Sequence, residues 1–427
     1  MSSGIQNPEH SAGGGKLASL PGTVLSEIAH EHGTPVWVYD AETIRQQVDR
    51  LRAFDVTRYA QKACSNLSIL RMMRALGVLV DAVSLGEVER ALAAGYGVGG
   101  EPAPIVFTAD LLDSQTARRL AELEVPVNAG SPQMLEQVGQ MRKGYPVWIR
   151  VNPGFGHGHS RKTNTGGEHS KHGIWHELVQ ANLSIVDHLG LDVVGFHMHI
   201  GSGVDYTHLQ RVCESMVDQV RRSQRDVRAI SAGGGLSVPY RGTEAPVNTQ
   251  HYFSLWDEAR REIEGIVGHA VQLEIEPGRF LVAQSGVLVT EVRAHKNVGN
   301  NHFTLVDAGF NDLMRPAMYG SHHRVSVFDP QGRPLEGELA PTTVAGPLCE
   351  SGDVFTQNAA GEVESVRLPR VHVGDLVVFH DTGAYGSSMS SNYNTRCLAP
   401  EVMVDGPDVK LIRRRQTIDE LLALEAV

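Results

Sequence analysis

The 427-residue chain has few cysteines, and their spacing matches no familiar motif. The four residues, Cys64, Cys213, Cys349 and Cys397, stand far apart, and no pair has CxxC spacing. A chain of this length can bury a stable core without disulfide bridges. The sequence therefore predicts free thiols in a reducing compartment and disfavours a disulfide-rich scaffold.

Long apolar runs and an excess of basic residues are also missing. No stretch approaches the ~20 apolar residues of a membrane span. Residues 1–20 show no basic patch followed by an apolar run, so we expect a flexible N-terminus and not a signal peptide. Lys and Arg number 38 against 49 Asp and Glu, a net charge of −11, which disfavours a general basic surface for nucleic acid. We therefore expect a cytoplasmic protein without membrane or nucleic-acid partners.

The first two thirds of the chain alternate short apolar runs with amphipathic segments. The apolar runs predict eight parallel strands at residues 58–60, 78–83, 105–107, 125–128, 147–152, 193–200, 229–232 and 271–276. Helix starts are indicated by Ser84 with Glu87, a capping box, and by Ser131 with Pro132. Eight β/α units in one run favour a (β/α)8 barrel of the TIM type, with an open doubly wound sheet as the alternative.

The last third of the chain shows a different pattern of secondary-structure signals. Short β-like runs are broken by Gly, Pro and Asp, and the only long helix signal is at 417–424. This pattern predicts a separate all-β domain, and residues 35–39 form a strand that we expect to join its sheet. The predicted organisation is a flexible segment 1–20, a segment 21–45 joining the β domain, a barrel at 46–285 and a β domain at 286–427.

Polar residues gather at the carboxyl ends of the predicted barrel strands, where such barrels hold their chemistry. They are Lys62 after the first strand, His197 and His199 on the sixth, Gly233, Gly234 and Gly235 after the seventh, and Glu276 at the end of the eighth. Each also has an interpretation without a function. Lys62 can be a solvated lysine, the glycine run a flexible turn and Glu276 a carboxylate at the barrel mouth. His197 and His199, two apart on a strand, have a spacing familiar from zinc sites. Convergent further ligands are few, so stacking or hydrogen bonding by one histidine is the better interpretation.

Taken together, these residues match the needs of one cofactor. Pyridoxal phosphate requires a lysine for its aldehyde, N–H donors for its phosphate and an acidic partner for its ring nitrogen. Lys62, the glycine run and Glu276 supply these three groups, and His199 can stack on the ring. A carboxylate on the ring nitrogen keeps it protonated and makes the ring a strong electron sink.

The motifs in order resemble those of the fold-type III pyridoxal-phosphate-dependent decarboxylases and, within them, the diaminopimelate decarboxylase family. In the barrel they are Tyr59-Ala60-x-Lys62-Ala63, Ser84-Leu85-Gly86-Glu87, His197-Met198-His199-Ile200-Gly201-Ser202, Gly233-Gly234-Gly235 and Glu276-Pro277-Gly278-Arg279. In the β domain they are Met314-Arg315-Pro316-Ala317-Met318-Tyr319, Cys349-Glu350-Ser351-Gly352-Asp353, Gly383-Ala384-Tyr385 and Tyr393-Asn394. The resemblance implies a pyridoxal-phosphate-binding (β/α)8 barrel with a C-terminal β-sandwich or Greek-key β-barrel domain that also takes an N-terminal strand. It also implies a carboxy-lyase that converts meso-2,6-diaminopimelate to L-lysine and CO2, the last step of lysine biosynthesis.

The resemblance implies a role for each matching residue. Lys62 binds the cofactor covalently, and the cofactor-binding set also contains His199, Ser202, Gly234, Gly235, Glu276, Gly278, Arg279 and Tyr385. The substrate-binding set contains Arg279, Arg315, Tyr319, Glu350 and Tyr385. Cys349 is the catalytic proton donor, and in this family it comes from the partner subunit of a homodimer. No metal site is implied.

Substrate choice depends on the distal end of the amino acid. Two arginines can pair with a distal carboxylate, and Glu350 with a distal ammonium. Ornithine or lysine would place a bare cation near Arg315, which is unfavourable in a partly dry pocket. The sequence therefore favours diaminopimelate over the substrates of ornithine- or arginine-type decarboxylases of the same fold.

Three other interpretations remain open. An alanine-racemase-like enzyme should carry a positive residue at the ring nitrogen, which disagrees with Glu276. A metal-dependent amidohydrolase should carry its paired histidines on the first strand, not the sixth. A non-catalytic, pyridoxal-phosphate-binding relative usually loses the cofactor lysine or the acid, and this chain keeps Lys62 and Cys349. The histidines at 157, 159, 169, 172 and 176 match no known ligand spacing, and residues 413–415 are expected to be a solvated strand end.

Overall fold

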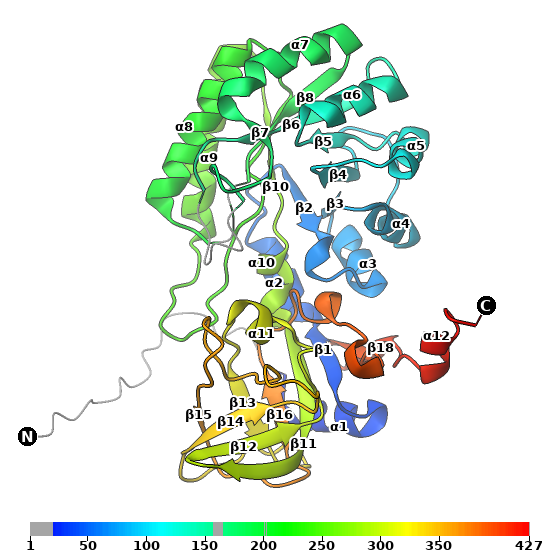
Figure 1. Ribbon diagram of the computed structural model, residues 1–427. Helices are drawn as coiled ribbons and strands as arrows, with labels where there is room; N and C mark the ends of the chain where they lie inside the picture. The colour runs from blue at the N-terminus through cyan, green and yellow to red at the C-terminus, as the bar shows by residue number, and fades with distance from the viewer. Residues whose placement is uncertain (1–19, 157–164, 200, 202, 427) are drawn as a thin grey trace, which may run out of the picture.

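The chain forms a parallel barrel with a β domain below it (Figure 1). The structure, a computed structural model, describes residues 20–156, 165–199, 201 and 203–426. Each barrel strand pairs in parallel with its two neighbours, and pairing of β5 with β6 closes the eight strands into a ring. The barrel strands are β2 (Val56–Ala60), β3 (Leu79–Ala82), β4 (Ile105–Ala109), β5 (Val127–Ala129), β6 (Pro146–Asn152), β8 (Asp192–His197), β9 (Ala229–Ser231) and β10 (Gln272–Ile275). Each of these strands overlaps one of the eight that the apolar runs predict, although several ends differ. The closed barrel is therefore confirmed and the open sheet is excluded.

Helices surround the barrel, and their starts follow from capping residues (Figure 1). Ser84 accepts a hydrogen bond from the Glu87 N–H, and Ser131 accepts one from the Met134 N–H, as N-cap side chains do. The Glu87 carboxylate reaches the N–H of Val83, one residue earlier than a standard capping box requires. The helices are α3 (Leu67–Ala75), α4 (Leu85–Ala93), α5 (Ser114–Leu123), α6 (Pro132–Met141), α7 (Val179–Leu189), α8 (Tyr206–Ser223), α9 (Thr249–Val267) and the short α10 (Arg279–Val282). A short extra strand, β7 (Ile174–Trp175), pairs with the carboxyl end of β6.

The β domain combines the two ends of the chain. Its main path runs β15-β14-β12-β11-β1-β17-β18, and β16 pairs with β11 and β13. Strand β1 (Val36–Asp40) lies between β11 and β17, antiparallel to the first and parallel to the second, which confirms that an N-terminal strand joins this sheet. The other strands are β11 (Gly286–Val298), β12 (Asn301–Val306), β13 (Val325–Phe328), β14 (Ala340–Ala345), β15 (Val366–Leu368), β16 (Leu376–Phe379), β17 (Glu401–Asp405) and β18 (Asp408–Arg413). The remaining helices flank them: α1 (Gly22–His32), α2 (Ala41–Asp49), α11 (Arg315–Tyr319) and α12 (Ile418–Leu422).

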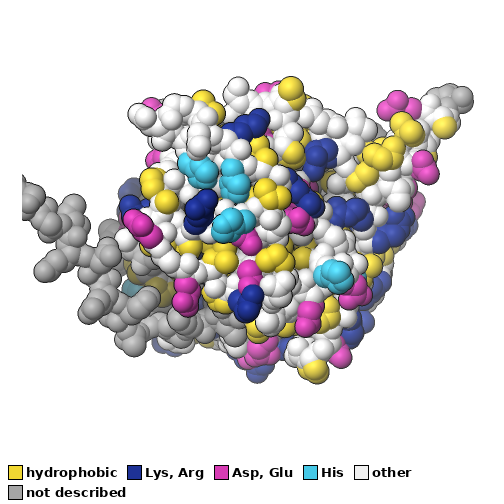
Figure 2. All heavy atoms as spheres, turned by 90° about the horizontal axis from the view of Figure 1, so that it is seen from below, with side chains coloured by type: hydrophobic (Ala, Val, Ile, Leu, Met, Phe, Trp, Pro, Cys, Tyr) yellow, Lys and Arg dark blue, Asp and Glu magenta, His cyan; other side chains and the backbone are white. Residues whose placement is uncertain are grey.

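The surface of the β domain carries charges of both signs. Seen from below, acidic and basic side chains are interspersed with a group of histidines and scattered apolar side chains (Figure 2). His295 and His302 are stacked in this domain, with ring centroids 5.5 Å apart. None of the helices in the described part of the chain is long and apolar enough to cross a membrane.

Contacts between the barrel and the β domain fasten one loop beside the first barrel strand. The N–H of Tyr385 donates to the Ala63 carbonyl oxygen at 2.8 Å, and the Ser388 hydroxyl donates to the same oxygen at 3.0 Å. A further contact fastens the N-terminal segment to the β domain, because both carboxylate oxygens of Asp405 accept from Arg45 at 2.8 Å. The loop of the β domain is therefore held against the residue directly after Lys62. The exact domain limits, 45/46 and 285/286, stay a prediction.

Candidate active site

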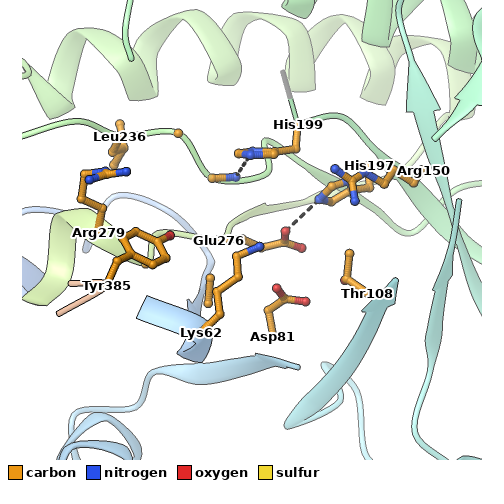
Figure 3. A pocket seen from close by; sticks show the side chains of 14 residues that line it. Lys62, Asp81, Thr108, Arg150, His197, His199, Leu236, Glu276, Arg279 and Tyr385 are labelled. Carbon is orange, nitrogen blue, oxygen red and sulfur yellow. Dashed lines mark hydrogen bonds and ion pairs between the residues drawn. The ribbon is translucent and has the colours of Figure 1, made fainter. Parts of the chain in front are cut away.

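A polar cavity lies at the carboxyl ends of the barrel strands, which we call the strand-end cavity (Figure 3). Lys62, His199, Gly234, Gly235, Glu276, Gly278, Arg279 and Tyr385, all expected at a binding site, line it together. The condition on which the sequence interpretation depends, that Lys62 and Glu276 face one small volume, is therefore met. Asp81, Thr108, Arg150 and His197 also line it, although the sequence interpretation assigned them no role.

Lys62 lies in a short 3-10 turn, Gln61–Ala63, directly after β2. Its neighbours Gln61 and Ala63 are buried, whereas the Lys62 side chain is exposed toward the cavity. The side chain points into the centre of the cavity, beside Asp81 and Glu276 (Figure 3). A primary amine is thus presented at the place where the barrel opens.

Glu276 comes directly after β10 and is held by its neighbours on the barrel wall. Its Oε2 lies 2.7 Å from His197 Nε2, and its Oε1 accepts from the Ser231 hydroxyl at 3.3 Å. Burial alone would raise the pKa of Glu276, but the charge of His197 and its hydrogen bond, together with the charge of Arg58, lower the pKa to about 2. The buried side chain is therefore an ionised carboxylate at neutral pH.

His199 lies beyond the end of β8, and its ring is fixed by the glycine loop. The Gly234 N–H donates to His199 Nδ1 at 2.9 Å. Burial, together with the positive charges of Arg150 and Lys62, lowers the pKa of His199 well below its usual value. The ring is neutral and flat against the cavity, which suits stacking on an aromatic ligand.

The predicted strand 193–200 is too long. Strand β8 ends at His197, because its partner β9 ends at Ser231, the residue opposite His197 in the register. The backbone then leaves the sheet, so His197 and His199 do not share a strand face. His197 instead points to Glu276, and His199 to Gly234 (Figure 3). The paired-histidine spacing therefore arises from two separate contacts.

The glycine loop brings backbone close to the cavity. Gly235 has φ of +104°, and a Cβ atom there would lie 2.4 Å from the Gly201 carbonyl oxygen. A Cβ atom on Gly234 would lie 2.6 Å from the Glu276 carbonyl oxygen. Only glycine fits these two positions. The Gly234 N–H is engaged by His199, so at these two positions the Gly235 N–H is the donor of the kind that a phosphate group requires. Ser202, expected nearby, lies outside the described residues.

Asp81, Thr108 and Arg150 were assigned no role, although each lies within a predicted strand or directly after one. Burial and the Glu276 charge raise the pKa of Asp81 to about 7. Its Oδ1 is buried and has no hydrogen-bond partner among the described residues. Arg150 is buried on β6 with its charge near Asp110, Glu276 and Asp81. Arg150 lies two residues before the end of its predicted strand, so a search of the last three residues of every strand for charged side chains would have found it.

A second cavity, the adjoining cavity, opens from Lys62 and His199 toward the β domain and has a volume of about 460 Å³. Arg279, Arg315, Tyr319 and Tyr385 line it, as expected of a substrate-binding set, and Tyr240 joins them. The two guanidinium groups flank the Tyr240 ring, with Arg279 5.7 Å and Arg315 4.7 Å from its centroid. Two cations therefore meet at one wall of a cavity that begins at Lys62.

The two arginines are oriented by specific contacts. Arg279 Nη1 donates to the Tyr240 hydroxyl at 2.8 Å, and its guanidinium lies 4.9 Å from the Tyr385 ring centroid. Arg315 Nη1 lies 3.0 Å from His323 Nε2, and the opposite ring nitrogen of His323 bonds the His380 carbonyl oxygen at 2.9 Å. A carbonyl oxygen can only accept, so His323 donates through Nδ1 and accepts from Arg315 through Nε2.

Cys349 and Glu350 lie apart from these residues. Both are exposed, and neither is among the described residues that line the strand-end or adjoining cavity. The Cys349 N–H donates to Asn394 Oδ1 at 3.2 Å, and Glu350 Oε1 accepts from the Tyr393 hydroxyl at 2.5 Å. Within one chain, the expected proton donor therefore does not reach Lys62. No group of three or more His, Cys, Asp or Glu in the described residues could hold a metal ion.

The chain is similar to known proteins over nearly its whole length. Residues 41–283 match the family described as pyridoxal-dependent decarboxylase, pyridoxal binding domain. The diaminopimelate decarboxylases of Streptomyces coelicolor and Escherichia coli K12 are 69% and 62% identical, covering 95% and 94% of this chain and 92% and 96% of their own lengths. A crystal structure of diaminopimelate decarboxylase, 62% identical, superposes with a TM-score of 0.92 and covers 94% of this chain and 96% of that chain. The Helicobacter pylori enzyme complexed with L-lysine, 30% identical, has a TM-score of 0.81 over 94% of this chain and 99% of that chain.

Proposed function

The chain belongs to the pyridoxal-dependent decarboxylases and, within them, to the diaminopimelate decarboxylases, and from this premise we propose how its residues perform the reaction. The enzyme decarboxylates meso-2,6-diaminopimelate to L-lysine and CO2 with pyridoxal phosphate as cofactor, the last step of lysine biosynthesis. The observation that supports this function best is the continuity of the two cavities. Lys62 and His199 line both the strand-end cavity, which contains Glu276, and the adjoining cavity, which contains Arg315.

The strand-end cavity fits the cofactor by its donor set. Lys62 offers an amine for the aldehyde, Gly234 and Gly235 leave room for a phosphate against the backbone, and Glu276 offers a carboxylate for the ring nitrogen. The neutral His199 ring offers a flat face for stacking, and Arg279, Gly278 and Tyr385 border the same volume. Bound pyridoxal phosphate supplies an aromatic ring that accepts the electron pair left when the carboxylate departs.

The protein contributes charge placement and exclusion of water. Glu276 is buried and ionised, so it stabilises a positive charge on a ring nitrogen in contact with it. Because the carboxylate is already held by His197 and Ser231, it needs little reorganisation during the reaction. Positioning of the scissile bond by such contacts can account for roughly 7–11 kcal/mol of the barrier at most.

Arg279, Arg315 and Tyr319 bind the distal carboxylate of the substrate. Two guanidinium groups at one wall of the adjoining cavity provide several N–H donors for a single carboxylate. Arg315 is buried, so its charge is poorly screened and strongly disfavours a bare distal ammonium. This arrangement favours diaminopimelate over ornithine and lysine.

We infer a homodimer in which Cys349 and Glu350 of one subunit complete the cavity of the other. Both side chains are exposed and lie outside the cavities of their own chain, which supports a role at a partner's site. The Cys349 thiol then delivers a proton to the substrate α-carbon, and Glu350 pairs with the distal ammonium. The cysteines in this chain are all free, which supports a cytoplasmic location.

Incubation of the purified protein with pyridoxal phosphate and meso-diaminopimelate tests the function directly. We expect release of CO2 and L-lysine in equal amounts, and much weaker turnover of L-ornithine. Lys62→Ala, which removes the amine, is the control and should show neither product. Equal use of ornithine and diaminopimelate would contradict the assignment of substrate.

A further inference from the structure

His197 is one of the buried residues of the strand-end cavity, and so far it has entered the reaction only as one of two side-chain partners of the Glu276 carboxylate. It is the last residue of β8, and only 1% of its surface is exposed. Its Nε2 lies 2.7 Å from Glu276 Oε2, the shorter of the two side-chain hydrogen bonds to that carboxylate. The dashed line in Figure 3 joins the two side chains at the end of the cavity that also holds Arg150.

Side chains from two neighbouring strands hold the Glu276 carboxylate. His197 comes from β8, the Ser231 hydroxyl that bonds Oε1 comes from β9, and Glu276 comes directly after β10. The Glu276 backbone is fixed as well, because its N–H donates to the Gly233 carbonyl oxygen at 2.8 Å. Each carboxylate oxygen thus has one partner on the barrel wall, and the remaining lone pairs face the cavity.

The contacts of His197 show which of its ring nitrogens acts on Glu276. The Nδ1 atom is buried and has no partner among the described residues. The Nε2 atom contacts Glu276 Oε2, and because an ionised carboxylate oxygen can only accept, Nε2 donates. His197 therefore acts as a hydrogen-bond donor to Glu276 through Nε2.

We propose that His197 is a positioning residue that orients Glu276 toward the ring nitrogen of the bound cofactor and keeps it ionised. This inference rests on the proposed function, since it assumes that Glu276 contacts that nitrogen. Without the donor, Glu276 would be a buried carboxylate that has lost its shorter side-chain hydrogen bond. Burial would then dominate, its pKa would rise, and a protonated Glu276 could no longer stabilise a positive ring nitrogen.

Several other charged or titratable groups face Glu276 and set the background for its titration. They come from five other places in the barrel: Arg58 on β2, Lys62 after β2, Asp81 on β3, Arg150 on β6 and His199 after β8. All of them remain in a His197 variant, so a change in pH dependence on substitution reports on His197 itself.

The test compares His197→Leu, which fills the space without a donor, with His197→Gln, whose amide can donate from a similar position. We expect kcat of the leucine variant to fall roughly 10- to 100-fold, as for loss of a hydrogen bond to a charged group, with KM changed less than about threefold. The glutamine variant should recover most of this loss. The ratio of leucine-variant kcat to wild-type kcat should rise with pH between 6 and 9, as Glu276 regains its charge.

Cofactor binding to the apoprotein gives a readout that does not depend on turnover. The dissociation constant for pyridoxal phosphate, measured by quenching of tryptophan fluorescence at pH 6 and pH 8, should increase in the leucine variant, more at pH 6. In a double-mutant cycle, His197→Leu should have little further effect once Glu276→Gln is present, because the two residues act as one unit. If the leucine variant does not fold, His197→Asn replaces it, since its shorter amide cannot reach Glu276.

The outcomes separate this inference from the proposed function. Wild-type protein that neither binds pyridoxal phosphate nor releases CO2 from diaminopimelate overturns the function. Wild-type activity combined with a leucine variant that matches it at every pH overturns only the role of His197. Equal losses in the glutamine and leucine variants, or additive effects with Glu276→Gln, also overturn it, because they indicate a packing role.

Discussion

Replacement of Arg315 by methionine tests how the enzyme selects its substrate. Arg315 is 5% exposed, its Nη1 bonds His323 at 3.0 Å, and its guanidinium lies 4.7 Å from the Tyr240 ring centroid. Methionine keeps much of the volume and can still pack on the aromatic ring, so the main change is loss of one positive charge and its donors. The fold should therefore tolerate the substitution better than it would a truncation to alanine.

The expected size of the effect follows from the lost contact. A hydrogen bond to a charged group contributes about 1.5–3 kcal/mol, so kcat/KM for meso-diaminopimelate should fall roughly 10- to 150-fold. Discrimination against L-ornithine should narrow as well, because a bare distal ammonium no longer faces a buried cation. Steady-state assays of CO2 release with both substrates measure kcat and KM separately.

Arg333→Met is the matched control, because it removes a surface arginine whose side chain is 73% exposed and paired with Asp329. It should leave kcat/KM for both substrates unchanged. If Arg315→Met kept the wild-type preference for diaminopimelate over ornithine, selection by charge at the distal carboxylate would be refuted.

Three further perturbations have expected outcomes of their own. Lys62→Ala and Cys349→Ala are each expected to be inactive, but mixing them should restore activity by forming mixed dimers with one intact site; no recovery on mixing would contradict the shared site. Burial lowers the pKa of His380 to about 3, so the folded protein stays neutral at this residue while the unfolded chain takes up a proton below about pH 6.5. The free energy of unfolding therefore decreases as pH falls from about 6.5 toward 3. In His380→Gln, urea unfolding of the apoprotein should show a weaker dependence of this free energy on pH, by up to about 1.4 kcal/mol per pH unit. Arg58 donates two hydrogen bonds to the buried Glu274, at 2.6 and 2.9 Å. Arg58→Met leaves that carboxylate without its partner, so the free energy of unfolding, measured by chemical denaturation, should fall by about 3–5 kcal/mol. The double variant Arg58→Met with Glu274→Met should lose less free energy of unfolding than Arg58→Met alone. An equal or larger loss would contradict this account.

The barrel could be predicted because its strands are buried on both faces. Strand β4, for example, appears in the sequence as a short apolar run, and the residues directly after the barrel strands lie at the same rim of the barrel. Lys62 and Glu276 could therefore be predicted as site residues from their positions in the sequence, without knowledge of the distance between their side chains. The end of β8 could not be predicted, because it depends on where the neighbouring strand β9 stops.

Contacts between distant segments could not be predicted from local pattern. Tyr240 lies in a barrel loop and Arg315 on a helix of the β domain, and no spacing in the sequence relates them. The same holds for His323, whose role depends on a carbonyl oxygen at His380. His197 was noticed for its distance from His199 along the chain, whereas its actual partner is 79 residues away.

The placement of β1 in the middle of the C-terminal sheet has a consequence for synthesis of the chain. This strand is buried at every position, yet its partners β11 and β17 begin only at Gly286 and Glu401. At ribosomal speeds of ~5–20 residues per second, the strand emerges on the order of ten to fifty seconds before its first neighbour. During that interval an apolar strand with two open edges can pair with other nascent chains, so translation rate and chaperone supply should govern the yield of this enzyme more than the stability of its barrel does.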